Sequence, residues 1–427
     1  MQRTLSTLFT LIVWVGSTLA QTQTRFWDFE GPNDLEGWRM HDGSPLQTTS
    51  GVSSSTAILL PTGPPVGNFD SPSFIYHPLP YDPNVNYNVT FWQRNSSQNV
   101  YVAAFLAWVD TLSVPAQLTG VNTMMTTTGA APWVCNEFWD EWSLPGFGTF
   151  CICIAGNSSA PDELFIDNVS VELVPQGAAL LWDTRLFLGG NYEPGLERMG
   201  TDLSTQGLLP LSEPYSALGY PQLSGGGGEW CTPAVVHPDN LYRAVDWVRI
   251  ELRSATDPSV IVATKQGMLT SLGSIASFNG QLSFNFGVPA GDYYVAVRHR
   301  NHLAAMTALP VTLSATMYAS SIDLRSPAQT TWGTEARKSE GSYRLLWPGD
   351  VNGDGVVKYV GTNNDRDPIL VAVGGSSPTN IVSNVYDVRD VNLNGTIKYV
   401  GVGNDRDPLL LSIPAAVPTN TRVAQLP

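Results

Sequence analysis

Short runs of alternating apolar and polar residues, separated by glycines and prolines, constrain the fold of this chain most. Segments such as 87–92, 164–171 and 292–297 alternate with the period of two that places successive side chains on opposite faces of a β-strand. The 39 glycines and 31 prolines interrupt helices and favour turns between such strands. The pattern therefore predicts a mainly β protein built from sandwiches or barrels.

The first twenty residues have the three parts of a cleavable signal peptide. Arg3 precedes an apolar run over 8–15, and a small-residue site follows at 18–20. This run is too short to cross a bilayer of about 30 Å, and no later segment approaches about 18 uninterrupted apolar residues. We therefore expect a secreted protein, extracellular or at the cell surface, without a transmembrane segment and with a mature chain that starts at Gln21.

Composition and charge narrow the possible partners and set the domain plan. The net charge is −15, and the clustered basic residues that neutralise phosphates are absent, so we expect no nucleic-acid partner. An acidic surface suits divalent cations, and 43% apolar residues allow several cores. The predicted division is a signal peptide (1–20), a first β domain (21–175), a connecting segment (176–232), a second sandwich (233–325), a linker (326–345) and a tandem repeat (346–427).

Region 21–175 carries a resemblance at both of its ends. It opens with Phe-Glu-Gly at 29–31 and Gly-Trp at 37–38, and it closes with Ile-Asp-Asn-Val at 166–169. These features resemble the jelly-roll domains of carbohydrate-binding modules and related galactose-binding-like domains. The resemblance implies a jelly-roll β-sandwich in which the first and last strands pair.

That pairing would bring Glu30 or Asp28 near Asp167. Carboxylate oxygens are the ligands that Ca²⁺ prefers, so Glu30 and Asp167 are candidates for a second, structural metal site. The alternative is that these acids face solvent or cap turns.

Three tryptophans of the same region are candidates for a glycan-binding surface. Flat aromatic faces stack on pyranose rings while polar neighbours take the hydroxyl groups. Trp133, Trp139 and Trp142 lie in a loop-like, acid-containing stretch, which favours exposure. The alternative is ordinary packing, because large aromatic side chains are mostly buried.

The four cysteines permit disulfides in an oxidising compartment. Cys135, Cys151 and Cys153 are close in sequence, whereas Cys231 stands alone. A local bridge from Cys135 to Cys151 or Cys153 is the preferred pairing, with Cys151 the first choice. A metal site at 151–153 is the weaker interpretation, because the spacing is one residue rather than two.

The middle region predicts an immunoglobulin-like β-sandwich. Segment 245–253 alternates, but neither of its faces is uniformly apolar, which favours a strand near an edge. The glycine run 225–228 lacks the phosphate-loop pattern and is interpreted as a turn. The basic tract 298–302 offers only two histidines, expected on opposite faces of a strand end. The stretch 291–302 resembles segments of large surface proteins of Bacteroidetes-type bacteria, and the whole chain looks like a secreted protein of that kind.

The C-terminal region contains the most specific signal. Segment 349–380 recurs 40 positions later as 389–420, with 17 of 32 aligned residues identical, which indicates a tandem structural unit. Each copy opens with Asp-x-Asn-x-(Asp or Asn)-Gly, which places oxygen side chains at positions one, three and five of a calcium loop. The glycine at position six lets the next backbone carbonyl face the ion. The predicted Ca²⁺ ligands are Asp350, Asn352, Asp354 and the carbonyl of Val356 in the first loop, and Asp390, Asn392, Asn394 and the carbonyl of Thr396 in the second.

These loops resemble the calcium loops of dockerin modules, which are paired loop–helix units. The resemblance implies short helices after each loop and a cohesin-like or other surface protein as a possible partner. The alternative is that the motifs are plain Asn-Gly and Asp-Gly turns. Because Asn394 replaces an acid, the second loop should bind Ca²⁺ more weakly than the first.

One departure from the dockerin pattern concerns the closing ligand. Position twelve, where an acid is expected, is glycine in both copies. A small insertion would move the acid, and Asp365 and Asp405 are the preferred closing ligands. Asp367 and Asp407 precede prolines and are interpreted as N-caps of the short helices.

Three functional hypotheses follow. The first is a non-catalytic adhesion or docking protein, in which the jelly roll binds glycan or another extracellular polymer and the calcium module stiffens the tail or docks a partner. The second is a structural protein of the extracellular matrix, a surface layer or a filament. The third, a polysaccharide hydrolase with an undetected site, ranks last because no motif selects a catalytic carboxylate pair.

Overall fold

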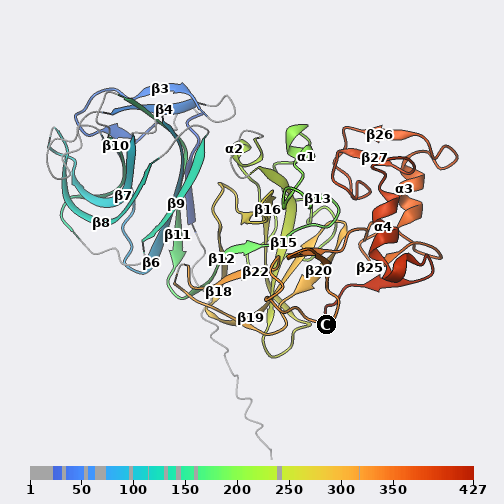
Figure 1. The fold of residues 1–427 in the computed structure, drawn as a ribbon. Coiled ribbons are helices and arrows are strands. Elements are labelled where there is room, and N and C mark those ends of the chain that lie inside the picture. The colour runs from blue at the N-terminus through green and yellow to red at the C-terminus, as the bar shows by residue number, and fades with distance from the viewer. Residues whose placement is uncertain are drawn as a thin grey trace, which may run out of the picture.

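The computed structural model has three packed parts that follow one another along the chain (Figure 1). No helix among the described residues is long and apolar enough to cross a membrane. The expected signal peptide lies outside the described residues. These are 23–30, 35–51, 56–62, 74–95, 100–113, 115–128, 133–140, 146–157, 162–237, 243–316 and 318–427.

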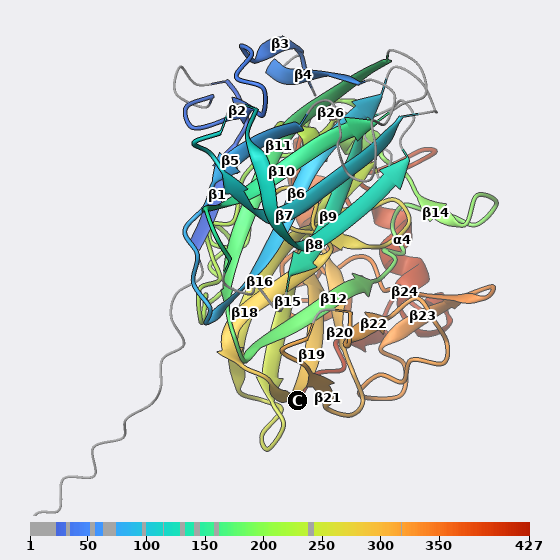
Figure 2. The ribbon, with the colours of Figure 1, turned by 90° about the vertical axis from the view of Figure 1, so that its left-hand side faces the viewer.

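The first part is a β-sandwich of two antiparallel sheets, seen face-on in Figure 2. The predicted mainly β fold with an N-terminal jelly-roll sandwich is confirmed. One sheet runs β3 (Gln47–Ser50), β4 (Thr56–Thr62), β11 (Asp162–Pro175), β6 (Val85–Asn95) and β9 (Val134–Asp140), with β1 (Gln23–Trp27) also paired to β11. The other runs β2 (Arg39–Met40), β5 (Phe74–Pro78), β10 (Thr149–Asn157), β7 (Tyr101–Asp110) and β8 (Gln117–Thr128).

Alternation along the strands builds the core of this sandwich. Ile152 and Ile154 of β10 face the interior, while Cys151 and Cys153 face the opposite side of the same sheet. The expected pairing of the first and last strands is present, with Trp27 opposite Val169.

The second part is also a two-layer sandwich, and it begins earlier in the chain than the sequence indicated. The segment expected as a connection contributes β12 (Ala178–Arg185), whose Leu181 packs in the same core as Ile250 and Phe286. The small sheet runs β18 (Ser283–Pro289), β12 (Ala178–Arg185) and β22 (Ser321–Asp323). The large sheet runs β17 (Ile275–Ala276), β16 (Ile261–Thr270), β15 (Ala244–Ser254), β19 (Gly291–His299) and β20 (His302–Met306), with β21 (Val311–Leu313) on β19. Smaller elements are β13 (Tyr192–Glu193), β14 (Arg198–Met199), α1 (Asp202–Thr205) and α2 (Pro233–Val236).

Strand β15 corrects the expectation of an edge position. It pairs with β16 on one side and β19 on the other, so it is a central strand. Its polar face is buried because Glu251 forms ion pairs with Arg249 and Arg253, at 3.1 Å and 2.8 Å. Mixed polarity in the sequence therefore reflects a buried ion network, not exposure to solvent.

The third part holds the tandem repeat, and each copy consists of a loop, a short strand and a helix. The two helices pack together over a shared core that includes Val357, Ile369, Ile397 and Leu409. A hairpin of β23 (Arg337–Glu340) and β24 (Tyr343–Leu346) occupies the expected linker. The remaining elements are β25 (Val356–Lys358), α3 (Arg366–Ala372), β26 (Ile381–Ser383), β27 (Thr396–Lys398), α4 (Arg406–Ser412), the 3₁₀ helix η2 (Pro414–Ala416) and β28 (Thr421–Val423). Strand β25 pairs with β28, and β26 pairs with β27.

A two-residue turn connects the first two parts. Strand β11 ends at Pro175 and β12 begins at Ala178. Gly177 between them has a φ of +83°, in the left-handed region that favours glycine. The turn is fixed by two backbone hydrogen bonds, from Gln176 N–H to the Asn84 carbonyl and from Ala290 N–H to the Gly177 carbonyl.

Candidate calcium-binding loops

The first loop of the repeat is closed by Asp365, which lies fifteen positions after the loop's first acid. Oδ1 of Asp365 accepts hydrogen bonds from the backbone N–H groups of Val351 (2.8 Å) and Asn352 (3.2 Å). Oδ2 accepts from the N–H of Lys358 at 2.8 Å. The side chain thus reaches back across the loop, as expected of a closing residue moved by an insertion, and Asp350 accepts from Gly355 N–H at the other end of the turn.

The second loop repeats this arrangement nearly atom for atom. Asp405 accepts from the N–H groups of Val391 (2.7 Å), Asn392 (3.3 Å) and Lys398 (2.8 Å). Asp390 accepts from Gly395 N–H at 2.8 Å. Two segments that share only about half of their residues therefore fold into the same loop.

Side chains at positions three and five form the inner turns of both loops. The Asn352 side-chain oxygen accepts from Asp354 N–H at 2.9 Å, and Asp354 accepts from Val356 N–H at 2.9 Å. The second loop has the equivalent bonds. The Asn392 side-chain oxygen accepts from Asn394 N–H, and the Asn394 side-chain oxygen accepts from Thr396 N–H at 2.9 Å. These bonds keep the polar side chains of one loop on the same small turn.

Within the described part of the chain, the buried acids of each loop form no salt bridge with a basic side chain. Burial raises the pKa of Asp350 to about 6, with a further contribution from the charge of Asp354. Burial also raises the pKa of Asp365 to about 7, and the charge of Asp350 adds to the effect. Burial likewise raises the pKa of Asp390 to about 6, although the charge of Arg300 opposes the rise, and it raises the pKa of Asp405 to about 7.

The raised pKa values of the loop acids indicate that their negative charges are poorly compensated by the surrounding protein groups. Two carboxylates buried close to each other are costly unless a positive charge compensates them. Among the described residues, no group of three or more His, Cys, Asp or Glu side chains is placed to hold a metal ion, so the predicted ligands Asp350, Asp354 and Asp365 do not form such a cluster. A calcium site in either loop would have to combine acids with asparagine side chains and a backbone carbonyl, which are oxygen donors of the kind that Ca²⁺ accepts.

The helices begin two residues earlier than the sequence indicated. Helix α3 starts at Arg366 and α4 starts at Arg406, so the expectation that Asp367 and Asp407 are N-caps is wrong. Asn364, which the sequence pattern did not indicate, hydrogen-bonds through its side chain to the first turn of α3. Its side-chain oxygen accepts from Asp367 N–H at 2.9 Å, and its amide donates to the Gly361 carbonyl at 2.7 Å.

A buried polar network attaches the second loop to the middle sandwich. Asp246 on β15 accepts from the Arg300 guanidinium at 2.8 Å and from the Tyr386 hydroxyl at 2.6 Å. Burial alone would raise the pKa of Asp246, but Arg300 and His299 hold it below its ordinary value. The Asn301 side chain donates to the backbone carbonyls of Val388 and Asp390, at 2.9 Å and 2.8 Å. The network therefore ends on the backbone of the loop's first residue.

The two histidines of the basic tract face each other. A tight turn reverses the chain after β19, so His299 and His302 lie opposite in the β19–β20 pair with their Nδ1 atoms 3.0 Å apart. The expectation that they point to opposite faces is therefore wrong. The Gly190 N–H donates to Nε2 of His302, and Nε2 of His299 contacts Asp246. Burial lowers the pKa of both imidazoles, which suits neutral rings in a structural contact.

The candidates for a second metal site have separate partners. Glu30 is exposed, and its carboxylate accepts from the N–H of Thr56. Asp167 is fully buried, and it accepts from the N–H of Asn168 at 2.7 Å. Within the described part of the chain these two residues belong to no metal-binding cluster.

The predicted aromatic surface is not formed by Trp139. This side chain is only 9% exposed and packs with Val174 and Leu180, beneath the turn that joins the first two parts. Trp133 is half-buried and packs under Arg94, whose guanidinium lies 5.3 Å from the ring centroid. Trp142 lies outside the described residues.

The predicted Cys135–Cys151 disulfide is absent, because all four cysteines are free. Cys135 lies on β9 and Cys151 on β10, which belong to opposite sheets of the first sandwich. Cys135 faces the middle sandwich, where its thiol contacts the Asn279 carbonyl, whereas Cys151 faces away from the inter-sheet core. Short separation in sequence did not place them together, because β9 and β10 follow each other in the chain but belong to different sheets.

Comparisons with solved structures find carbohydrate-binding modules. The chain is similar to a family 4 carbohydrate-binding module (16% identity, TM-score 0.26, 33% of this chain and 98% of that chain). It is also similar to the family 22 xylan-binding domain of a Paenibacillus barcinonensis xylanase (14%, 0.27, 35% and 94%). A third similarity is to a Clostridium thermocellum xylanase fragment with family 22 and family 10 modules (12%, 0.26, 34% and 28%). No protein-family model matches the chain, and no curated protein matches it.

Proposed function

We propose that this protein is a secreted, non-catalytic surface protein that binds calcium through its C-terminal repeat and binds a glycan or another extracellular polymer through its β-sandwiches. The observation that supports calcium binding is the duplication of one loop geometry. Asp365 and Asp405 make the same three backbone contacts, although about half of the surrounding residues differ.

Calcium would act on the tail by neutralising buried acids. The loop acids form no salt bridge with any described basic side chain, and an ion bound between them would remove their mutual repulsion. Because Asn301 holds the first residue of the second loop, stabilising that loop also stabilises its attachment to the middle sandwich. The repeat would then serve as a stiff tail or as a docking surface for a cohesin-like or other surface protein.

Thermal unfolding tests the calcium part of this proposal. The mature chain 21–427 and the double variant Asp350→Ala/Asp390→Ala are melted with calcium and with chelator. An ion at about one hundred times its Kd stabilises the folded state by about 2.7 kcal/mol, so the wild-type melting temperature should rise with calcium and that of the variant should not.

Asp257→Ala is the matched control for that experiment. This exposed acid caps a turn in the middle sandwich through the same kind of backbone hydrogen bond, to Ser259 N–H at 3.1 Å, but lies outside the repeat. Its calcium response should equal that of the wild type. A wild-type melting temperature that is the same with calcium and with chelator would refute calcium binding.

A structural role is the second candidate function, and the extent of buried contact between the parts favours it. Asn88 and Glu137 of the first sandwich meet Ser283 of the second, and Asp246 meets the repeat. A chain with such interlocked parts is suited to a matrix or a filament. Concentration-dependent assembly in analytical ultracentrifugation, without retention on any glycan, would place this function ahead of glycan binding.

A further inference from the structure

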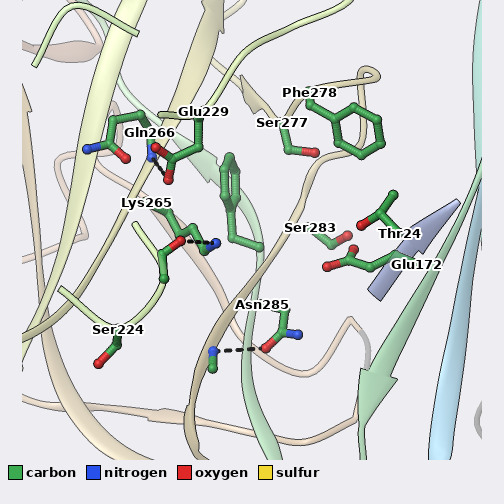
Figure 3. A pocket seen from close by; sticks show the side chains of 13 residues that line it. Thr24, Glu172, Ser224, Glu229, Lys265, Gln266, Ser277, Phe278, Ser283 and Asn285 are labelled. Atoms are coloured by element: carbon green, nitrogen blue, oxygen red, sulfur yellow. Dashed lines mark hydrogen bonds between the residues drawn. The ribbon is translucent and has the colours of Figure 1, made fainter. Parts of the chain in front are cut away.

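A polar pocket opens along the seam between the first sandwich and the middle sandwich (Figure 3). We call it the seam pocket. Its volume is about 460 Å³, within the range of about 300–1,000 Å³ that is typical of small-molecule sites. Thr24 and Glu172 come from the first sandwich, while Lys265 and Asn285 come from the middle one.

The walls of the seam pocket are held by buried contacts between the two sandwiches. The Trp92 indole N–H donates to the Asn279 carbonyl at 3.1 Å, and the Asn88 amide donates to the Ser283 hydroxyl at 2.9 Å. The glycine run reaches the pocket because Gly226 packs against Thr264, where a Cβ atom would lie 2.2 Å from the Thr264 carbonyl oxygen. The pocket is thus a fixed feature of the fold.

The polar groups on one side of the pocket are already oriented. Lys265 donates to the Gly225 carbonyl at 3.0 Å. Glu229 accepts from the N–H groups of Gly227 (2.7 Å) and Gln266 (3.3 Å). Side chains held by backbone bonds lose little freedom when a ligand arrives, which favours binding.

Glu172 faces these groups from the other side, next to Thr24 (Figure 3). Burial raises the pKa of Glu172 to about 7, while the nearby charge of Lys265 opposes the rise. Near neutral pH this carboxyl can both donate and accept a hydrogen bond. Opposed donors and acceptors of this kind match a ligand with hydroxyl groups better than a simple ion.

An aromatic cluster adjoins the pocket and is built by both sandwiches. Phe278 lines the pocket, and its ring centroid lies 5.8 Å from those of Phe26 and Trp230. Trp230 is 45% exposed, although large aromatic side chains are mostly buried. An exposed indole beside polar side chains offers the flat apolar surface on which a sugar ring stacks.

We propose that the seam pocket is a saccharide-binding site, in which Trp230 and Phe278 contact the apolar face of a sugar ring and Glu172, Lys265 and Glu229 bind its hydroxyl groups. This inference rests on the glycan-binding part of the proposed function and does not depend on calcium. It places the ligand at the junction of the two sandwiches and not on the tryptophans that the sequence indicated.

Calorimetric titration tests the site with soluble oligosaccharides of glucose, xylose, mannose and N-acetylglucosamine. The wild type is compared with Trp230→Ala and Lys265→Met, which remove the exposed ring and the ammonium group. Phe147→Ala is the control, because Phe147 is 89% exposed and does not line the pocket. We expect each seam variant to weaken binding about tenfold or more, and the control to bind as the wild type does.

The outcomes separate this inference from the proposed function. If the wild type binds an oligosaccharide and both seam variants bind it equally well, the seam pocket is not the site, while glycan binding by the protein stands. If the wild type binds none of the oligosaccharides, both the inference and the glycan part of the function fail. Release of new reducing ends by the wild type would overturn the non-catalytic assignment, and its loss in both seam variants would still support the location of the site.

Discussion

The hydroxyl of Tyr386 donates a 2.6 Å hydrogen bond to Oδ1 of Asp246, across 140 residues of sequence. Tyr386 precedes the second calcium-loop candidate, and Asp246 lies on the central strand of the middle sandwich. The Arg300 guanidinium completes the contact, since it binds Asp246 and lies 4.4 Å from the Tyr386 ring centroid. This buried carboxylate therefore joins the Asn301 contacts in connecting the tail to the sandwich.

Disrupting this contact should lower the stability of the protein. Tyr386→Phe removes one hydrogen bond to a buried charge and should cost about 1.5–3 kcal/mol of unfolding free energy. Arg300→Met leaves Asp246 without its guanidinium partner and should cost about 3–5 kcal/mol. Urea denaturation followed by circular dichroism measures both changes.

Arg366→Met provides the matched control for the Arg300 variant. Arg366 also lies over a tyrosine ring, 5.3 Å from the Tyr359 centroid, and pairs with an acid, but the Asp367 side chain of that pair is 52% exposed. Exposed pairs contribute about 0–1 kcal/mol. Equal losses from the Arg300 and Arg366 variants would contradict the importance of the buried network.

The two loops should differ in calcium affinity, because Asn394 occupies the place of Asp354. Asn394→Asp adds one negative charge to the second loop and should tighten its binding about tenfold, equivalent to about 1.4 kcal/mol. Asp354→Asn should weaken the first loop by a similar factor. Titration of each single-loop variant by calorimetry resolves the two sites, and the prediction fails if the exchange leaves both affinities unchanged.

The contribution of Glu172 to the free energy of unfolding should fall as the pH rises. Its folded pKa of about 7 is above the ordinary value of 4.5, so between these values the folded state retains a proton that the unfolded state has released. Glu172→Gln removes this dependence. The variant should gain melting temperature over the wild type as the pH rises from about 4 to about 8, with no difference at the acidic end. A constant difference across this range would show that the carboxyl is not buried.

Gly280 should resist substitution for two separate reasons. Its φ of +91° disfavours any other residue, and an added Cβ would lie 3.1 Å from Sγ of Cys135 and 3.2 Å from the Trp92 ring. Gly219 has a φ of +82° with open space around it, so Gly219→Ala carries only the backbone cost of about 1 kcal/mol. Gly280→Ala should cost more than this in urea denaturation, and equal costs would mean that the contact at the seam can relax.

The four cysteine thiols should react slowly with thiol reagents in the folded protein. Burial raises the pKa of Cys151 and Cys231 to about 12 and also raises that of Cys135 and Cys153, which suppresses the reactive thiolate. Ellman's reagent should therefore detect few thiols under native conditions and four after denaturation. Detection of only two after denaturation would indicate a disulfide.

The sequence predicted the features that depend on local pattern. Strand alternation identified the sandwiches, and the repeated motif identified both loops, including Asp365 and Asp405 as the residues that reach back across them. The start of the helices was missed by two residues, because Asn364 accepts from the N–H of Asp367, which lies inside the helix instead of capping it.

Features that depend on contacts between distant segments were not accessible in this way. Arg249 and Glu251 look like surface residues in sequence, but they are buried because charged partners lie beside them. Strand β12 could not be assigned to the middle sandwich before its partner β22, about 140 residues later, was known. The seam pocket likewise combines Thr24 with Asn285, which no local pattern relates.

The turn at Gln176 and Gly177 has a mechanical consequence. With only two residues between β11 and β12, neither sandwich can swing far from the other without breaking the bonds to Asn84 and Ala290. The two sandwiches therefore move as one rigid body, and the short turn between them fixes their relative orientation. A protein attached by its tail would present its N-terminal face in a constant orientation, so that many copies on one surface would all point the same way.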